Sequence, residues 1–123
     1  MRKKTIASMA LAFAIVGTSS AAFAETHTDT MTYNGKTINC SLTGDFRWTG
    51  LDYGKARTEW SSTNNINKVY VYLIGDSVSK SDTGYTWAEA NVEEESVWDF
   101  NSTHKLLDGT GTNTLVSRQL SDW

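Results

Sequence analysis

The sequence predicts an all-β protein, a small two-sheet antiparallel β-sandwich of seven or eight short strands. One continuously apolar run, residues 68–74, is rich in β-branched and aromatic side chains and is too short for a typical helix. An Asn34-Gly35 pair separates two segments that alternate apolar and polar residues. Turn-forming residues recur at a spacing of roughly 8 to 12 positions, which is typical of sandwiches and barrels.

The first 24 residues have the pattern of a cleaved signal peptide. Three basic residues begin it, an apolar core follows over residues 6–16, and Ala22-Phe23-Ala24 supplies a small-x-small cleavage site. The apolar core is shorter than the roughly 20 residues that a membrane-spanning helix needs. We therefore expect cleavage before Glu25, no membrane span, a secreted or extracytoplasmic bacterial protein, and one domain over residues 25–123.

Removal of the leader makes the chain more acidic. Of 11 Lys and Arg residues, three leave with the leader, so eight basic residues remain against 14 acidic ones and the net charge becomes −6. This charge argues against a nucleic-acid partner, because phosphate binding needs a basic patch. Cys40 is the only cysteine, so no internal disulfide can form, and the oligomeric state and any pairing of Cys40 between chains stay open.

The Asn34-Gly35 pair predicts a β-hairpin, because both residues tolerate the positive φ of a type I′ turn. A two-residue loop pairs Tyr33 with Lys36, and this register collects the apolar side chains, Cys40 among them, on one face. A cysteine on the core face is most simply an inert, buried thiol.

The rest of the chain alternates short strands with turns. Residues 25–30 form a polar lead-in that we expect to fray, residues 43–45 and 50–54 predict turns, and residues 78–84 predict an exposed connection. The expected strands are, in order, residues 46–49, 56–60, 68–74, 96–100, 103–107 and 114–120.

The strand at residues 68–74 is apolar on both of its faces. Val69, Val71 and Leu73 lie on one face, and Tyr70, Tyr72 and Ile74 lie on the other. We therefore expect both faces to be covered by packing.

Residues 85–100 allow two interpretations. Thr86-Trp87-Ala88-Glu89 matches a capping box, which predicts a helix. The following residues make no apolar stripe at helical spacing, whereas the alternation of Ala88, Ala90 and Val92 favours a strand. We expect a strand that ends at the three glutamates 93–95.

No local motif indicates catalysis, a metal or a cofactor, and we expect a non-enzymatic protein. Cys40, His104 and Asp108 could form a nucleophilic site only if the fold brought them together. Asp108, Thr110 and Thr112 alternate in a glycine-containing loop as calcium ligands do, but the motif is incomplete and a polar turn is the simpler interpretation.

Carboxylates are plentiful, and a pair of them across a cleft could hydrolyse a glycosidic bond. The simpler interpretation is that they form solvated faces and loop tips. They are Asp45, Asp52, Glu59, Glu89, Glu93, Glu94, Glu95 and Asp99.

Aromatic content is the main indication of function. The chain has five tryptophans and five tyrosines, more than a small core easily hides. Two or three of them could form an exposed platform for sugars or proteins, and the alternative is that they fill the space between the sheets. Trp123 and Trp48 are the strongest candidates for exposure. The predicted ligand-binding residues are Trp48, Tyr53, Trp60, Trp87 and Trp123.

In general plan the chain resembles small exported proteins of Gram-positive bacteria and small secreted β-sandwich bacteriocins. The resemblance rests on the leader, the size and the Thr- and Ser-rich composition, so it implies no residue roles. We expect a binding module for a cell-surface glycan, an extracellular polysaccharide or a protein partner. The alternatives are a bacteriocin-like or toxin-like effector and a small carboxylate-dependent hydrolase.

Overall fold

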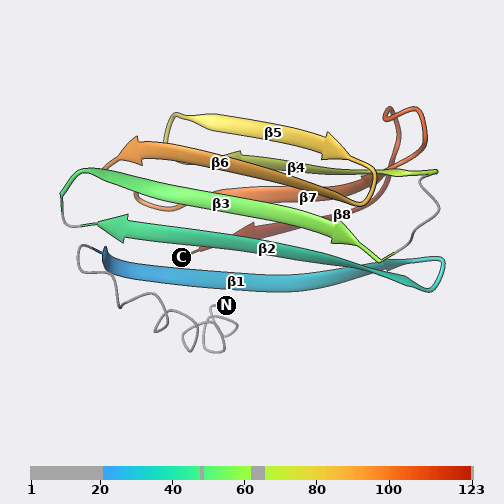
Figure 1. The fold of residues 1–123 in the computed structure, drawn as a ribbon, viewed down its shortest axis with the longest axis horizontal. Helices are drawn as coiled ribbons and strands as arrows, with labels where there is room; N and C mark the ends of the chain where they lie inside the picture. Colours follow the sequence, from blue (N-terminus) through green and yellow to red (C-terminus); the bar gives the residue numbers. More distant parts are fainter. Residues whose placement is uncertain (1–20, 48, 62–65, 123) are drawn as a thin grey trace.

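Two four-stranded antiparallel sheets make up the protein (Figure 1), as the sequence predicts. The structure is a computed structural model that describes residues 21–47, 49–61 and 66–122. Its strands are β1 (Ala21–Tyr33), β2 (Lys36–Arg47), β3 (Leu51–Trp60), β4 (Lys68–Ile74), β5 (Ser79–Gly84), β6 (Trp87–Glu95), β7 (Asn101–Leu107) and β8 (Thr114–Ser121). Sheet A has the order β1-β2-β3-β6, and sheet B has the order β5-β4-β7-β8.

The predicted hairpin of β1 and β2 is confirmed. Tyr33 pairs with Lys36, and Asn34 and Gly35 have φ angles of 51° and 76°. This register turns Cys40 into the core, where its side chain is 1% exposed. The chemistry of the turn and the apolar pattern of the strands therefore select the same pairing.

Sheet A is longer than the sequence pattern indicates. The expected frayed lead-in at residues 25–30 is wrong, because β1 begins at Ala21, four residues before the expected cleavage position. The expected turn at residues 43–45 is also wrong, and of the expected turn at residues 50–54 only Gly50, with a φ of 88°, lies in the connection between β2 and β3. Gly44 and Gly54 instead pair with each other inside β2 and β3.

Phe100 explains why these glycines lie within strands. A Cβ atom on Gly54 would lie 2.6 Å from Cδ1 of the Phe100 ring, and one on Gly44 would lie 3.1 Å from its Cδ2. The glycine pair thus makes room for a large, fully buried ring. Residues 96–100, expected as a strand, form the connection that delivers Phe100 to this place.

In sheet B, β4 has the predicted bounds and lies between β5 and β7. Residues 79–84, expected as an exposed connection, form the edge strand β5, in which polar residues are tolerated because most of its side chains are exposed. The predicted hairpin near the C-terminus is confirmed as the antiparallel pair of β7 and β8. Residues 87–95 form the strand β6, with Ala88, Ala90 and Val92 buried as expected.

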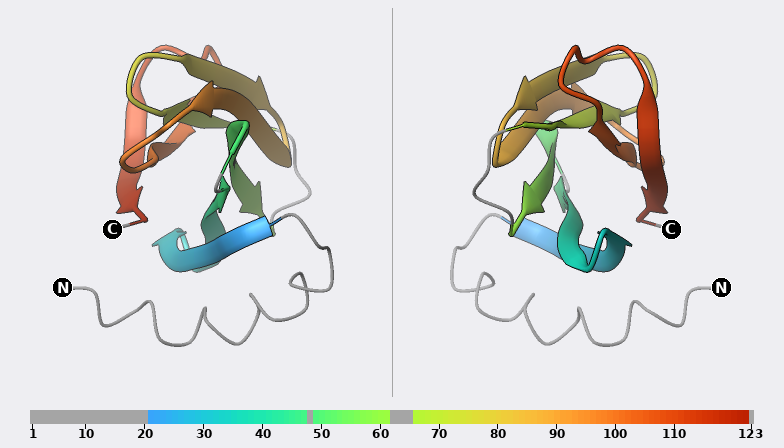
Figure 2. Two further views of the ribbon diagram at one scale, coloured as in Figure 1. Left: turned by 90° about the vertical axis from the view of Figure 1, so that its left-hand side faces the viewer. Right: turned by 90° about the vertical axis from the view of Figure 1, so that its right-hand side faces the viewer.

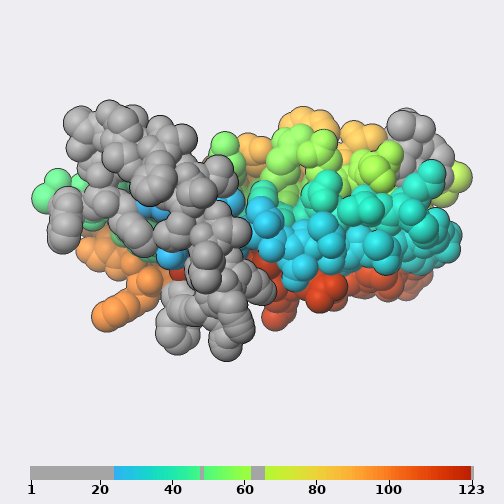
Figure 3. All heavy atoms as spheres, turned by 90° about the horizontal axis from the view of Figure 1, so that it is seen from below, coloured from blue at the N-terminus to red at the C-terminus, as the bar shows by residue number. Residues whose placement is uncertain are grey.

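The core lies between the two sheets (Figure 2), and both sheets contribute to it, together with Phe100 from the connection between β6 and β7. The sheets also approach each other at their edges, where β6 adjoins β5 and β1 adjoins β8. Figure 3 shows the atoms of β8 running along the edge formed by β1. The described residues include no helix that could cross a membrane.

Candidate functional site

The outer face of sheet A consists of the side chains that point away from the core in β1, β2, β3 and β6. On β3 these alternate with buried residues and are Leu51, Tyr53, Lys55, Arg57 and Glu59. Register places Asp45 and Glu93 on either side of Tyr53, and Ser41 and Glu89 on either side of Arg57. Short polar side chains and long charged ones therefore surround the aromatic rings of this face.

Trp87 is the largest exposed ring on this face, with half of its surface exposed. The guanidinium carbon of Arg57 lies 4.5 Å from the centre of the Trp87 ring, within cation–π range. Arg57 also donates from Nη1 to Glu89 at 3.2 Å and from Nε to Glu59 at 3.3 Å. Two carboxylates thus hold the cation over the indole and fix the orientation of both groups.

Tyr53 forms a second cation–π pair on this face, with Arg47. The guanidinium carbon of Arg47 lies 4.9 Å from the centre of the Tyr53 ring, and Arg47 Nη2 donates to Asp45 at 3.0 Å. This hydrogen bond to Asp45 raises the pKa of the Arg47 guanidinium above its usual value. Tyr53 is 36% exposed, so much of its ring remains open to a ligand.

An open hollow of about 950 Å³ lies beside Tyr53. Its lining combines the tyrosine ring with hydroxyl, amide, ammonium and carboxylate groups, which can donate and accept hydrogen bonds. The polar lining residues are Thr26, Thr43, Asp45, Lys55, Lys80, Asn91 and Glu93. The hollow extends from β1 across sheet A to β5, so it could hold an extended polar molecule.

Two structural carboxylates fix the end of the sandwich beside this hollow. Asp52, expected on a solvated surface, is buried and accepts from the backbone N–H groups of Arg47 at 2.7 Å and Val97 at 2.9 Å. Glu94 accepts from the backbone and hydroxyl of Ser77 and from the N–H of Val78. The backbone bond from Ser77 is the main reason that the pKa of Glu94 is lowered.

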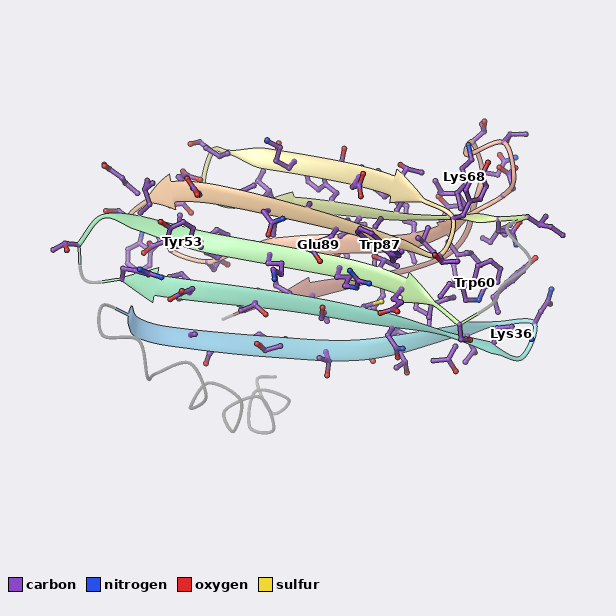
Figure 4. All side chains as sticks on the ribbon, viewed as in Figure 1. Lys36, Tyr53, Trp60, Lys68, Trp87 and Glu89 are labelled. Atoms are coloured by element: carbon purple, nitrogen blue, oxygen red, sulfur yellow. The ribbon has the colours of Figure 1, made fainter. Side chains whose placement is uncertain are left out.

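The structure describes three of the five predicted ligand-binding residues and does not bring them together. Tyr53 and Trp87 lie on the outer face of sheet A, toward opposite ends (Figure 4). Trp87 pairs with Glu59, six positions along β3 from Tyr53, which corresponds to roughly 20 Å. Trp60 is only 5% exposed and belongs to the core, so it cannot join an exposed platform. Trp48 and Trp123 lie outside the described residues.

The nucleophilic combination that the sequence left conceivable, Cys40 with His104 and Asp108, is not joined by hydrogen bonds in the described part of the chain. His104 is fully buried and hydrogen-bonds Thr58 and Ser102. Burial raises the pKa of the Cys40 thiol to about 12, so the thiolate needed for nucleophilic attack does not form near neutral pH. Asp108 instead accepts hydrogen bonds within its own turn, from Thr110 and Asn113 among others.

These hydrogen bonds make the Asp108 loop a polar turn, and they lower the pKa of Asp108. Within residues 21–47, 49–61 and 66–122, no three His, Cys, Asp or Glu side chains are grouped as a metal site requires.

The two arginines of the site were not predicted from the sequence. Alternation along residues 51–59 places Tyr53 and Arg57 on one face, so this pattern in the sequence could have predicted that they share a surface. The stacking of Arg57 on Trp87 depends on the pairing of β3 with β6, and this pairing joins segments about thirty residues apart. The exposed Trp98, 87% exposed in the connection after β6, was also not among the predicted residues.

Comparisons with protein-family models, with curated proteins and with solved structures gave no match to this chain. The outer face of sheet A and its hollow are therefore the main basis for a function.

Proposed function

We propose that this chain is an exported, non-enzymatic binding module that holds a glycan in the hollow beside Tyr53. The observation that carries the proposal is the combination of a fixed, partly exposed ring with polar side chains on both sides of it. An aromatic face packs against the apolar face of a sugar ring, and the surrounding polar groups bond its hydroxyls. The outward residues of β3 that follow Tyr53 are all charged, whereas the centre of a protein interface is depleted of charged residues.

The rigidity of the site supports the same function. Arg47 is fixed against Tyr53 by Asp45, and the neighbouring loops are fixed by Asp52 and Glu94. A preorganised surface loses less conformational entropy when a ligand binds. Trp87 with Arg57 then forms a second contact point further along the same face.

The test is co-sedimentation of the purified protein with insoluble cell-wall and polysaccharide preparations. We expect depletion from solution that Tyr53→Ala reduces by about tenfold or more, since the ring supplies the central contact. Trp98→Ala is the matched control, because Trp98 is more exposed than either ring but lies outside the outer face of sheet A. Equal losses in both variants, or no depletion by any glycan, would contradict the proposal. Growth inhibition of related strains without sedimentation would favour the effector alternative.

A second candidate function is glycan hydrolysis in the same hollow. Asp45 and Glu93 flank Tyr53 on neighbouring strands, which places their backbones about 9.5 Å apart. An inverting mechanism requires the two carboxyl groups themselves to lie roughly 6.5 to 9.5 Å apart, and the carboxylate of Asp45 would have to act while it accepts from Arg47. Glu93 is exposed rather than enclosed in an apolar pocket, which is why binding alone is the first proposal. Release of reducing ends that is lost in Glu93→Gln would favour hydrolysis.

A further inference from the structure

The outer face of sheet B is the set of side chains that point away from the core in β4, β5, β7 and β8. β4 contributes Lys68, Tyr70, Tyr72 and Ile74, which alternate with buried residues. The neighbouring strands contribute mainly Ser, Thr, Asn and Gln, together with Lys105, which pairs with Tyr70. This surface lies on the opposite side of the sandwich from the outer face of sheet A.

The tyrosines of β4 are less covered than their sequence pattern indicates. Both faces of this strand were expected to be packed over, yet Tyr70, Tyr72 and Ile74 are only half-buried. Their rings lie among short hydroxyl and amide side chains, with Thr83 and Ser81 beside them on β5. Partly exposed rings in a polar surround are the same combination that suits sugar ligands.

The charge of this face differs from the charge of the whole chain. The chain has a net charge of −3, but the outward strand residues of sheet B include Lys68 and Lys105 and no Asp or Glu. Neither lysine forms an ion pair within the described residues. Their ammonium nitrogens instead lie 5.7 Å and 5.5 Å from the ring centres of Tyr85 and Tyr70.

Two shallow hollows follow one another along this face. The first, of about 360 Å³, is lined by both lysines, Tyr70 and Thr83. The second, of about 300 Å³, is lined by Tyr72, Asn101 and Gln119 among others. The cations are thus confined to one hollow, and the other offers uncharged hydrogen-bonding groups.

We propose that the outer face of sheet B binds an acidic glycan, a sugar polymer that carries carboxylate or phosphodiester groups. Tyr70 and Tyr72 pack against sugar rings, and Lys68 and Lys105 pair with the anionic groups. An anion gains from two ammonium groups that form no ion pair, on strands whose outward residues include no carboxylate. Asp108, which follows β7 beside the hollow of the lysines, is engaged by hydrogen bonds from Thr110, Thr112 and Asn113 of its own turn. The outer face of sheet A would repel an anion through Glu59, Glu89 and Glu93. Two cations are too few for a nucleic-acid site, which needs a longer basic surface. This site is separate from the hollow beside Tyr53.

The test is affinity electrophoresis of the purified protein in gels that contain polygalacturonate, a phosphodiester-linked mannan or neutral dextran. We expect an acidic polymer to retard the protein, and we expect this retardation to become weaker as salt is added. Lys68→Gln with Lys105→Gln should weaken this binding by about tenfold or more, because both charged contacts are lost. Tyr70→Leu should weaken it while leaving the charge unchanged. Binding to only one acidic polymer would identify the anionic group.

The matched control is Lys55→Gln with Lys80→Gln, which removes the same charge from the hollow beside Tyr53. If this control weakens the binding as much as the sheet B variant, or if no acidic polymer retards the protein, the proposal is wrong. Equal retardation by single-stranded DNA would also overturn it in favour of general polyanion binding. Loss of glycan binding in Tyr53→Ala, with the acidic-glycan binding intact, separates the two proposed sites.

Discussion

The imidazole of His104 in β7 joins the hydroxyl of Thr58 in β3, with Nδ1 2.8 Å from Oγ1, and this hydrogen bond links the two sheets through the core. Thr58 donates its own proton to the carbonyl oxygen of Tyr70, so its oxygen accepts from His104 Nδ1. Nε2 then accepts from the hydroxyl of Ser102 at 2.7 Å. A neutral histidine therefore satisfies every member of a buried polar network.

His104→Leu should destabilise the protein by about 2 kcal/mol, because the buried hydroxyl of Ser102 loses its acceptor. Adding Ser102→Ala to His104→Leu removes the unpaired hydroxyl and should restore part of the lost stability. Urea unfolding followed by tryptophan fluorescence measures both effects. Ser117→Ala, on the exposed side of β8, is the control and should change little. Equal stability of the single and double variants would show that the network is not satisfied as described.

Acid should destabilise the fold through the same histidine. Burial lowers the pKa of His104 from 6.5 to about 4. Between these values the unfolded chain holds the proton and the folded chain does not, so stability falls as the pH decreases from 6.5 to 4. The free energy of unfolding falls by about 3 kcal/mol across this range. The measurement is the free energy of unfolding between pH 6.5 and 4. In His104→Leu this free energy should no longer fall with decreasing pH through the titration of residue 104.

Asp122 should have the opposite effect. Burial raises its pKa from 3.8 to about 7, and the charges of Asp99 and Glu25 add to the rise. The folded chain therefore holds the proton between pH 3.8 and 7, whereas the unfolded chain has lost it. The free energy of unfolding falls by about 4 kcal/mol as the pH increases through this range. Asp122→Asn keeps the acceptor for Phe100 N–H and should be more stable than the wild type above pH 7. The control is Glu95→Gln, which removes a carboxylate that is exposed in the folded protein.

Cys40 should not react with thiol reagents in the folded protein. Its pKa is raised to about 12 by burial, so the reactive thiolate is scarce at pH 8. We expect a reaction with a disulfide reagent at least about a hundredfold slower than in urea, where the thiol is exposed and its pKa returns to its ordinary range. Rapid modification under native conditions would place Cys40 outside the core and reopen a nucleophilic or pairing role.

Gly54→Ala should destabilise the protein by about 2 kcal/mol, because the new Cβ would lie 2.6 Å from the Phe100 ring. Phe100→Leu in the same chain should offset part of this clash. Gly35→Ala is the matched control, because Gly35 has open space around it and only its φ of 76° opposes alanine. Thermal unfolding should show rescue by Phe100→Leu for Gly54→Ala and none for Gly35→Ala.

Local patterns predicted the fold class and several elements correctly. The Asn34-Gly35 turn, the bounds of β4 and the strand character of β6 depend on neighbouring residues and on alternation, which act over a few positions. The buried state of Cys40 followed from the register of its own hairpin. Such features are visible in one sequence because the interactions that decide them are local.

Tertiary contacts decided the rest. Residues 43–45 and 50–54 look like turns, but only Gly50 lies in a connection. The Phe100 ring, about fifty residues away, fills the space beside Gly44 and Gly54, which lie within β2 and β3. Trp60 and Trp87 have similar local patterns, yet opposite faces of sheet A place one in the core and the other at the surface. Composition and alternation determined an all-β sandwich rich in aromatic residues. Which rings are exposed, and which cations lie beside them, was set by the pairing of distant strands, because register assigns each side chain to a face.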